Sequence, residues 1–184
     1  MDLRNEQVDS IAAAVRLVAF DIDGTLTDGR IIIGSQGELA KAFSVRDGLG
    51  LRLLMDAGIT VAIITARESE IVARRCEELR IDHVLQGVKD KASAFASLAR
   101  TLNLPMAQTA FMGDDLPDLP ALRIAGLAAC VSDAEIEVRA HSDWISTRAG
   151  GCGAARELAQ YLLTAKGAWG EAIKRFTHDP DEQS

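Results

Sequence analysis

The chain passes from an apolar run into an acidic pair in the stretch Leu17-Val18-Ala19-Phe20-Asp21-Ile22-Asp23-Gly24-Thr25. The run before Asp21 is short and partly β-branched or aromatic, which predicts a buried strand that breaks into a turn at Gly24. Open parallel sheets bind ligands beyond the carboxyl ends of their strands, where Asp21 and Asp23 would lie. An isolated Asp-x-Asp is more often a polar turn, so the rest of the chain must decide between the two interpretations.

Apolar runs alternate with helix-like segments along the chain. Further strands are predicted at residues 60–65, 83–86, 109–112, 127–131 and 144–147, and helices at 47–57, 68–79, 91–102, 135–140 and 154–166. Alternation of this kind implies right-handed βαβ crossovers and a parallel sheet covered on both faces. The sequence therefore predicts an α/β fold with a doubly wound, Rossmann-like sheet in one domain, residues 1–184. Residues 1–14 are an N-terminal extension and 168–184 a frayed C-terminal tail.

Residues 28–45 interrupt the alternation. Residues 30–33 and 38–45 flank the turn Gly34-Ser35-Gln36-Gly37, which predicts a β-hairpin projecting just past the acidic pair. Its strands carry more apolar surface than a two-stranded ribbon can cover alone. We therefore expect the hairpin to pack against something else.

Composition limits the class of partner. The 184 residues carry a net charge of −7 and are 48% hydrophobic, which argues against nucleic acid or an anionic membrane as the main partner. A small anionic substrate remains possible, because a metal ion and arginines can reverse the field inside one pocket. Cys76, Cys130 and Cys152 share no metal-like spacing, and neither a signal peptide nor a membrane-spanning run is present. We expect a cytoplasmic protein.

Polar side chains follow four successive predicted strands. Asp21 and Asp23 end the first, Thr65 ends the second, Lys91 begins the helix after the third, and Asp114 follows the fourth. Each is a weak signal alone, since strand ends commonly carry caps and turns. Together they supply what phosphoryl transfer needs: a nucleophile, a cation, a hydroxyl donor and a metal site. Carboxylates from two strands suit Mg²⁺ better than zinc.

The same four segments, Asp21-Ile-Asp-Gly-Thr-Leu-Thr, Thr65, Lys91 and Gly113-Asp-Asp-Leu-Pro-Asp118, resemble the four signatures of the haloacid dehalogenase superfamily of aspartyl phosphatases. The resemblance implies that Asp21 is the nucleophile and Asp23 the general acid and base. It implies that Thr65 and Lys91 hold the phosphoryl oxygens, with Lys89 as the alternative lysine. The implied Mg²⁺ ligands are Asp21, the backbone carbonyl of Asp23, and Asp114, and the residues implied to support them are Asp115 and Asp118.

The chain has no room for the cap domain that closes most active sites of this superfamily. Residues 24–57 are taken up by the hairpin and one helix, and residues 66–90 by one helix and one strand. We therefore expect an open site, with water excluded by a neighbouring subunit that associates through the hairpin.

A narrower resemblance points the same way. The segments 28–30, 43–50, 62–67 and 150–157 are similar to those of the 3-deoxy-D-manno-octulosonate 8-phosphate phosphatase family. Such enzymes are capless homotetramers of lipopolysaccharide biosynthesis with inter-subunit active sites, and Gly150–Gly153 with Arg156 resembles their tail that reaches a neighbour's site. Cys152 stands where an arginine is more usual. The residues implied to contact the sugar acid, beside Asp23 and Lys91, are Ser44, Val45, Arg46, Asp47, Gly48, Arg52, Arg67 and Arg75.

Other interpretations stay open. Arg52 and Arg75 lie in helical segments, where a surface arginine is the usual finding, and Arg46 could form a simple ion pair with Asp47. A nonulosonate 9-phosphate is the alternative substrate. A non-catalytic oligomerisation module of the same fold is the alternative function, and a receiver domain is a further candidate that lacks the hairpin and the Gly-Asp-Asp segment.

Overall fold

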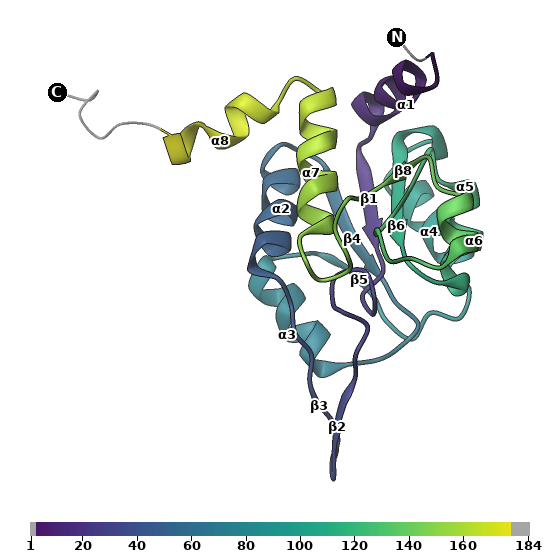
Figure 1. The fold of residues 1–184 in the computed structure, drawn as a ribbon, viewed down its shortest axis with the longest axis vertical. Coiled ribbons are helices and arrows are strands. Elements are labelled where there is room, and N and C mark those ends of the chain that lie inside the picture. The colour runs from purple at the N-terminus through teal and green to yellow at the C-terminus, as the bar shows by residue number, and fades with distance from the viewer. Residues whose placement is uncertain (1–2, 178–184) are drawn as a thin grey trace, which may run out of the picture.

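A six-stranded parallel sheet forms the centre of the structure, a computed structural model that describes residues 3–177 (Figure 1). The strand order is β5-β4-β1-β6-β7-β8, and every neighbouring pair is parallel. This arrangement confirms the predicted α/β fold class. The strands are β1 (Leu17–Phe20), β4 (Thr60–Ile64), β5 (His83–Leu85), β6 (Thr109–Gly113), β7 (Leu127–Cys130) and β8 (Trp144–Ile145).

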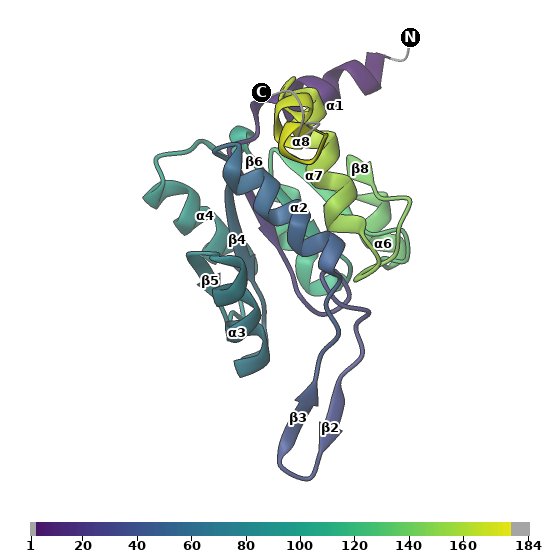
Figure 2. The same ribbon diagram turned by 90° about the vertical axis from the view of Figure 1, so that its left-hand side faces the viewer.

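Helices cover both faces of the sheet. One face carries α2 (Val45–Asp56), α3 (Glu70–Leu79) and α7 (Ala154–Ala165), and the other carries α4 (Lys91–Thr101) and α5 (Leu119–Ile124) (Figures 1 and 2). The short α6 (Ile136–Ala140) joins β7 to β8, and single 3₁₀ turns lie at Met106–Gln108 and Leu116–Asp118. The helices predicted from the sequence all occur, with ends shifted by one or two residues.

The place of strand β1 in the sheet determines where the site lies. All four of its residues are buried, and it pairs with β4 on one side and β6 on the other. The chain runs outward from β1 to β4 and β5, then returns to β6 on its other side. Ligands of open α/β sheets bind at such a switch point, outside the carboxyl ends of the strands. Asp21 follows β1 directly at that edge.

The predicted hairpin projects away from the body of the molecule (Figure 2). Its strands are β2 (Ile32–Gly34) and β3 (Gly37–Ala40), antiparallel and shorter than expected, with a register shift between Ile32 and Ile33. Ile33 is 73% exposed and Leu39 is 67% exposed. The hairpin therefore leaves Ile32, Ile33 and Leu39 in solvent.

Both ends of the described chain are helical, unlike the extension and tail that the sequence predicts. Residues Leu3–Ala14 form α1, and Trp169–Thr177 form α8. The expectation of a frayed tail from residue 168 is wrong as far as Thr177, because Trp169 and Ala172 pack against the core and the Arg156 guanidinium lies 5.1 Å from the centre of the Trp169 ring. The rest of the predicted tail, residues 178–184, lies outside the described residues.

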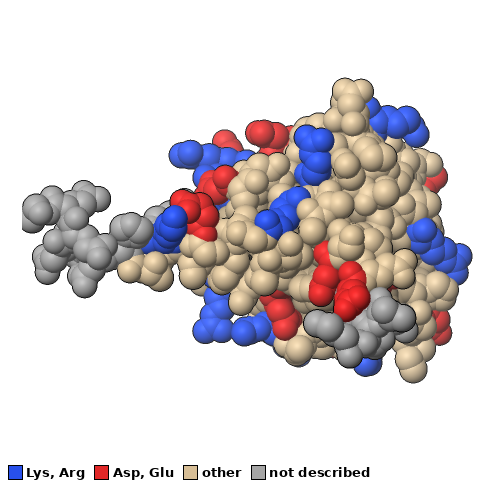
Figure 3. All heavy atoms as spheres, turned by 90° about the horizontal axis from the view of Figure 1, so that it is seen from above, with Lys and Arg blue, Asp and Glu red and all other residues tan. Residues whose placement is uncertain are grey.

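The surface fits the charge analysis. Acidic and basic side chains are interspersed over the face seen in Figure 3, on the side of α1 and α8. Within residues 3–177 no helix is both long enough and apolar enough to span a bilayer. Cys76 and Cys130 are buried free thiols, and Cys152 is an exposed one.

Candidate active site

Lys91 joins two carboxylates at the carboxyl edge of the sheet. Its Nζ atom lies 2.8 Å from Oδ1 of Asp21 and 2.6 Å from Oδ1 of Asp118, and all three side chains are buried. Burial alone would lower the pKa of Lys91, but the charges of Asp21 and Asp118 outweigh it and raise that pKa. The lysine is therefore a fixed cation beside Asp21. Lys89, the alternative lysine, is exposed.

Asp118 is held in place by the backbone that carries Asp114. Its Oδ2 accepts hydrogen bonds from the amides of Asp114 at 2.9 Å and Asp115 at 3.2 Å, while its Oδ1 accepts from Lys91. Asp115 is the N-cap of the 3₁₀ turn and accepts the Leu116 amide at 2.7 Å. Both residues thus lie where the resemblance places supporting groups, Asp118 against the lysine and Asp115 in the turn.

Asp114 is placed across the loop that follows Asp21. The hydroxyl of Thr25 donates to Oδ1 of Asp114 at 2.7 Å. A Cβ atom on residue 24 would lie 2.0 Å from Oδ2 of Asp114, and Gly24 has a φ of +97°. Only glycine permits both that backbone conformation and this approach. The loop after β1 is therefore shaped to bring Asp114 towards Asp21.

This acidic cluster fits a hard divalent cation. Carboxylate oxygens of Asp21, Asp114 and Asp118 lie within 4.8 Å of one another. Asp118 is already saturated by Lys91 and two amides, which leaves one oxygen each on Asp21 and Asp114. Burial, and next the charge of Asp118, raise the pKa of Asp21 to about 6 against the lowering effect of Lys91. Burial and neighbouring carboxylates raise the pKa of Asp114 to about 7. A cation between them would offset this crowding of negative charge.

Thr65 is buried directly after β4, the strand that pairs with β1 and so ends at the same edge of the sheet as Asp21. Its amide donates to the carbonyl of Leu85 at 3.0 Å, and its own carbonyl accepts the amide of Val88 at 3.0 Å. None of the hydrogen bonds among the described residues uses its hydroxyl. That hydroxyl is available to donate to a bound oxyanion.

Asp23 faces two cations. Its Oδ1 accepts from Nζ of Lys41, and its Oδ2 lies 3.8 Å from Nε of Arg67. The Lys41 side chain is fully buried, whereas that of Arg67 is 52% exposed. The structure thus brings Arg67, a predicted sugar-acid contact, to the site, together with a lysine that the sequence analysis did not identify.

The segment Ser44–Gly48 has structural partners of its own. Ser44 caps α2 and accepts the Asp47 amide at 3.3 Å. Asp47 is buried, and its carboxylate accepts the amides of Gly153 and Arg156. Gly48 packs against Arg75, whereas Val45 is 79% exposed. Contact of this segment with substrate stays a prediction.

Arg52 and Arg75 contact residues other than those of the acidic cluster. Arg52 donates to the carbonyl of Leu79 at 3.0 Å and lines a hollow with Thr60, at the amino end of β4. Arg75 pairs with Glu78 at 2.8 Å and lies 5.9 Å from the centre of the Phe43 ring. The structure does not bring Arg52 to the carboxyl edge of its own sheet.

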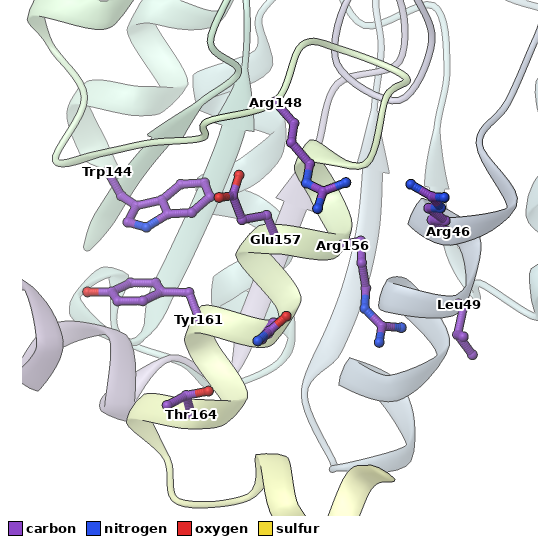
Figure 4. A pocket seen from close by; sticks show the side chains of 9 residues that line it. Arg46, Leu49, Trp144, Arg148, Arg156, Glu157, Tyr161 and Thr164 are labelled. Atoms are coloured by element: carbon purple, nitrogen blue, oxygen red, sulfur yellow. The ribbon is translucent and has the colours of Figure 1, made fainter. Parts of the chain in front are cut away.

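Arg46 lies in a separate pocket. This pocket of about 710 Å³ lies between α2, β8 and α7, and the guanidinium groups of Arg46, Arg148 and Arg156 border it (Figure 4). Trp144 and Tyr161 stack on its other side with ring centres 5.6 Å apart. Arg46 is exposed, and none of the ion pairs among the described residues joins it to Asp47.

The glycine-rich segment packs on the loop that follows β1 in its own chain. The Gly151 amide donates to the carbonyl of Thr25 at 3.0 Å, and a Cβ atom on residue 150 would lie 1.8 Å from the carbonyl oxygen of Gly24. The segment therefore supports the loop that places Asp114. Its predicted reach to a neighbouring subunit stays a prediction.

Two residues of the site were missed from the sequence. Thr25 is visible as part of the acidic motif, but its bond to Asp114, 89 residues away, depends on the fold. Lys41 is a charge between Ala40 and Ala42 in the apolar second strand of the predicted hairpin, and that contrast is the signal that could have drawn attention to it.

Comparisons with known proteins agree with this geometry. Residues 83–158 match the family model described as haloacid dehalogenase-like hydrolase. The chain is 43% identical over 166 residues to the 3-deoxy-D-manno-octulosonate 8-phosphate phosphatase of Escherichia coli strain K12, covering 89% of this chain and 88% of that protein.

Solved structures give the same result. The 3-deoxy-D-manno-octulosonate 8-phosphate phosphatase of Moraxella catarrhalis, in complex with magnesium, phosphate and KDO, superposes with a TM-score of 0.91 at 43% identity over 94% of this chain and 99% of that one. The cobalt-bound phosphatase of Haemophilus influenzae superposes with a TM-score of 0.86 at 37% identity, over 89% and 98%.

Proposed function

The chain belongs to the 3-deoxy-D-manno-octulosonate 8-phosphate phosphatases, within the haloacid dehalogenase-like hydrolases, and on this premise we propose that it hydrolyses that sugar-acid phosphate with the help of Mg²⁺. The observation that carries the proposal is the buried cluster in which Asp21 lies 2.8 Å from Lys91, with Asp114 held across the loop by Thr25. It combines a nucleophile, a cation and a metal site at the carboxyl edge of the sheet. The protein is a phosphoric monoester hydrolase.

Asp21 and Asp23 divide the chemistry. A carboxylate oxygen of Asp21 attacks phosphorus, the bond from phosphorus to the sugar oxygen breaks, and that oxygen takes a proton from Asp23. An aspartyl-phosphate and the free sugar acid result. Water then attacks phosphorus and gives its proton to Asp23, while the bond from phosphorus to Asp21 breaks and releases inorganic phosphate. Both carboxyl groups return to their starting states.

The surrounding groups hold charge in place. Lys91 and the Thr65 hydroxyl would contact the phosphoryl oxygens, and the ion pair with Asp118 supports this role by restraining Lys91. Asp21, Asp114 and the backbone carbonyl of Asp23 would hold Mg²⁺, and its positive charge would lower the repulsion between a carboxylate and a phosphate. Arg67, beside Asp23, suits the carboxylate of a sugar acid.

We further propose a homotetramer in which a neighbouring subunit completes each site. The exposed side chains of Ile33 and Leu39 on the projecting hairpin support association there. Arg46, Arg148 and Arg156 form a basic surface suited to a carboxylate brought by a neighbour. If Arg52 contacts substrate, the site must belong to another subunit, because Arg52 lies at the opposite edge of its own sheet. A place in lipopolysaccharide biosynthesis in the cytoplasm follows from the substrate.

Release of inorganic phosphate from 3-deoxy-D-manno-octulosonate 8-phosphate, with Mg²⁺ and with EDTA, tests the proposal. We expect turnover with Mg²⁺ that EDTA abolishes. Asp21→Asn should lose at least about 10³-fold in kcat because the nucleophile is gone. Asp82→Asn, at an exposed aspartate away from the cluster, is the matched control and should keep full activity.

The same assay separates the alternatives. A nonulosonate 9-phosphate and para-nitrophenyl phosphate complete the substrate panel. Preference for the nine-carbon substrate would change the assignment within the same chemistry. Absence of turnover on all three substrates, with the tetramer intact, would instead favour a non-catalytic oligomerisation module.

A further inference from the structure

Lys41 is a buried cation in an otherwise exposed part of the chain. It follows β3 at the base of the hairpin, and its side chain has no exposed surface. Hiding a lysine side chain is costly unless its charge is paired. Its neighbours Leu39 and Ala42 are exposed. The base of the hairpin therefore buries one charged side chain, whereas Ile33 and Leu39 stay exposed.

The partners of Lys41 connect the acid/base residue to a helix. Its Nζ atom contacts Oδ1 of Asp23 and lies 3.1 Å from Oε1 of Glu38, at an angle outside hydrogen-bond geometry. The other oxygen of Glu38 accepts from the hydroxyl of Ser69, which caps α3 and accepts the amide of Val72. Asp23 is thereby linked through Lys41 and Glu38 to the start of α3.

This linkage differs from the contact on the other oxygen of Asp23. Arg67 lies 3.8 Å from Oδ2, and half of its side chain is in solvent. An exposed long side chain at that distance restrains its partner weakly. Lys41 is buried, and its Nζ atom lies against the carboxylates of both Asp23 and Glu38. Of the two cations among the described residues that face Asp23, Lys41 is the one that can set the direction of the carboxylate.

We propose that Lys41 is a positioning residue, which holds the Asp23 carboxyl group in the orientation that delivers a proton to the leaving sugar oxygen. The inference rests on the proposed function and adds the hairpin to the acid/base machinery. Lys41 acts through Asp23 and takes no part in binding the phosphoryl group, because that role belongs to Lys91. A misplacement of about 1 Å at a reacting group can cost roughly 10² in rate.

The test compares two leaving groups in Lys41→Met, which keeps the length and the apolar stem of the side chain. The sugar oxygen must receive a proton to depart, whereas para-nitrophenolate departs without one. We expect kcat/KM for 3-deoxy-D-manno-octulosonate 8-phosphate to fall about 10- to 100-fold, within the range of general-acid effects. For para-nitrophenyl phosphate it should fall less than about threefold, because that step needs no general acid.

Controls separate this role from others. Lys174→Met, at an exposed lysine on α8, should match the wild type on both substrates. Glu38→Gln keeps Lys41 but weakens its tether, so it should show the same substrate dependence with a smaller fall. It also provides the test if Lys41→Met does not fold, as judged by its thermal midpoint.

Each outcome has one meaning. An inactive wild type overturns the proposed function itself. If the wild type is active and Lys41→Met lowers kcat/KM equally for both substrates, Lys41 only stabilises the hairpin, and the inference is overturned. A rise in KM for the sugar acid at constant kcat shows that Lys41 binds substrate and also overturns it. Equal effects of Glu38→Gln on the two substrates would count against it in the same way.

Discussion

The carboxylate of Asp47, in the first turn of α2, accepts the backbone amide of Arg156 at 2.8 Å across a sequence separation of 109 residues. Its other oxygen accepts the amide of Gly153 at 3.0 Å. One side chain thus satisfies amides at the start of α7, where the helix dipole favours negative charge. Burial raises the pKa of Asp47 despite these bonds. The contact joins α2 and α7, two of the three helices that cover one face of the sheet.

Asp47→Ala should destabilise the fold. Removing the carboxylate leaves the amides of Gly153 and Arg156, one buried and one partly buried, without this acceptor, so the free energy of unfolding should fall by about 2 kcal/mol. Urea denaturation followed by circular dichroism measures it, with Asp82→Ala at an exposed aspartate as the control. An unchanged midpoint with a raised KM would indicate the substrate contact suggested by the sequence instead.

Mg²⁺ should stabilise the protein through Asp114. A cation that binds only the folded state adds about 2.7 kcal/mol at one hundred times its Kd, so the thermal midpoint should rise with added Mg²⁺. Asp114→Asn should lose that rise, yet match or exceed the wild type in EDTA because it relieves the crowding of carboxylates. Calorimetry of both proteins with and without metal measures the effect. A rise of equal size in Asp114→Asn would place the metal elsewhere.

Gly24→Ala should damage the site beyond its effect on the backbone. The added Cβ would lie 2.0 Å from Oδ2 of Asp114, so the loop must shift and activity should fall by at least about 10². Gly58→Ala is the matched control: Gly58 also has a positive φ, of +79°, but an added methyl group there would meet no atom within 4 Å. It should lose about 1 kcal/mol of stability from strain and keep its activity. Equal activity losses in both variants would show that strain alone is responsible.

Charges at the exposed apolar positions of the hairpin should dissociate the assembly. The double substitution Ile33→Asp and Leu39→Asp places carboxylates where apolar contact is proposed, and the tetramer should become smaller species in light scattering. Ile136→Asp is the control, because Ile136 is equally exposed at 73% but lies on α6. A wild type that is monomeric, or a double variant that stays tetrameric, would exclude assembly through the hairpin.

The sequence predicts the central strands well because β1, β6 and β7 are fully buried and their side chains are mainly apolar. β1, for example, begins and ends at the predicted residues Leu17 and Phe20. The order of the acidic and basic groups along the chain was equally informative, since parallel strands bring their carboxyl ends to one edge. That is why Asp21, Lys91 and Asp114 could be grouped before any contact was known.

Other parts depend on contacts that no local pattern encodes. Helix α5 has six residues, too few for a periodic signal, and α8 owes its position to Trp169 packing on Arg156. The buried ion pair of Lys41 with Asp23 depends on the path that the hairpin takes back to the sheet. Arg52 looked like other arginines near the motif, yet its helix carries it to the far end of β4.

The turn at Ser35 and Gln36 is exposed, and exposed tips are usually where chains accept insertions and deletions. In β3, however, the Glu38 side chain is partly buried and accepts a hydrogen bond from Ser69, whereas Leu39, the next residue, faces solvent. Because successive side chains of a strand point to opposite sides, lengthening the tip by one residue would exchange these two. A single-residue insertion would turn a carboxylate outward and a leucine towards the acid/base pair. Insertions and deletions should therefore be selected against at this tip, even though it is exposed.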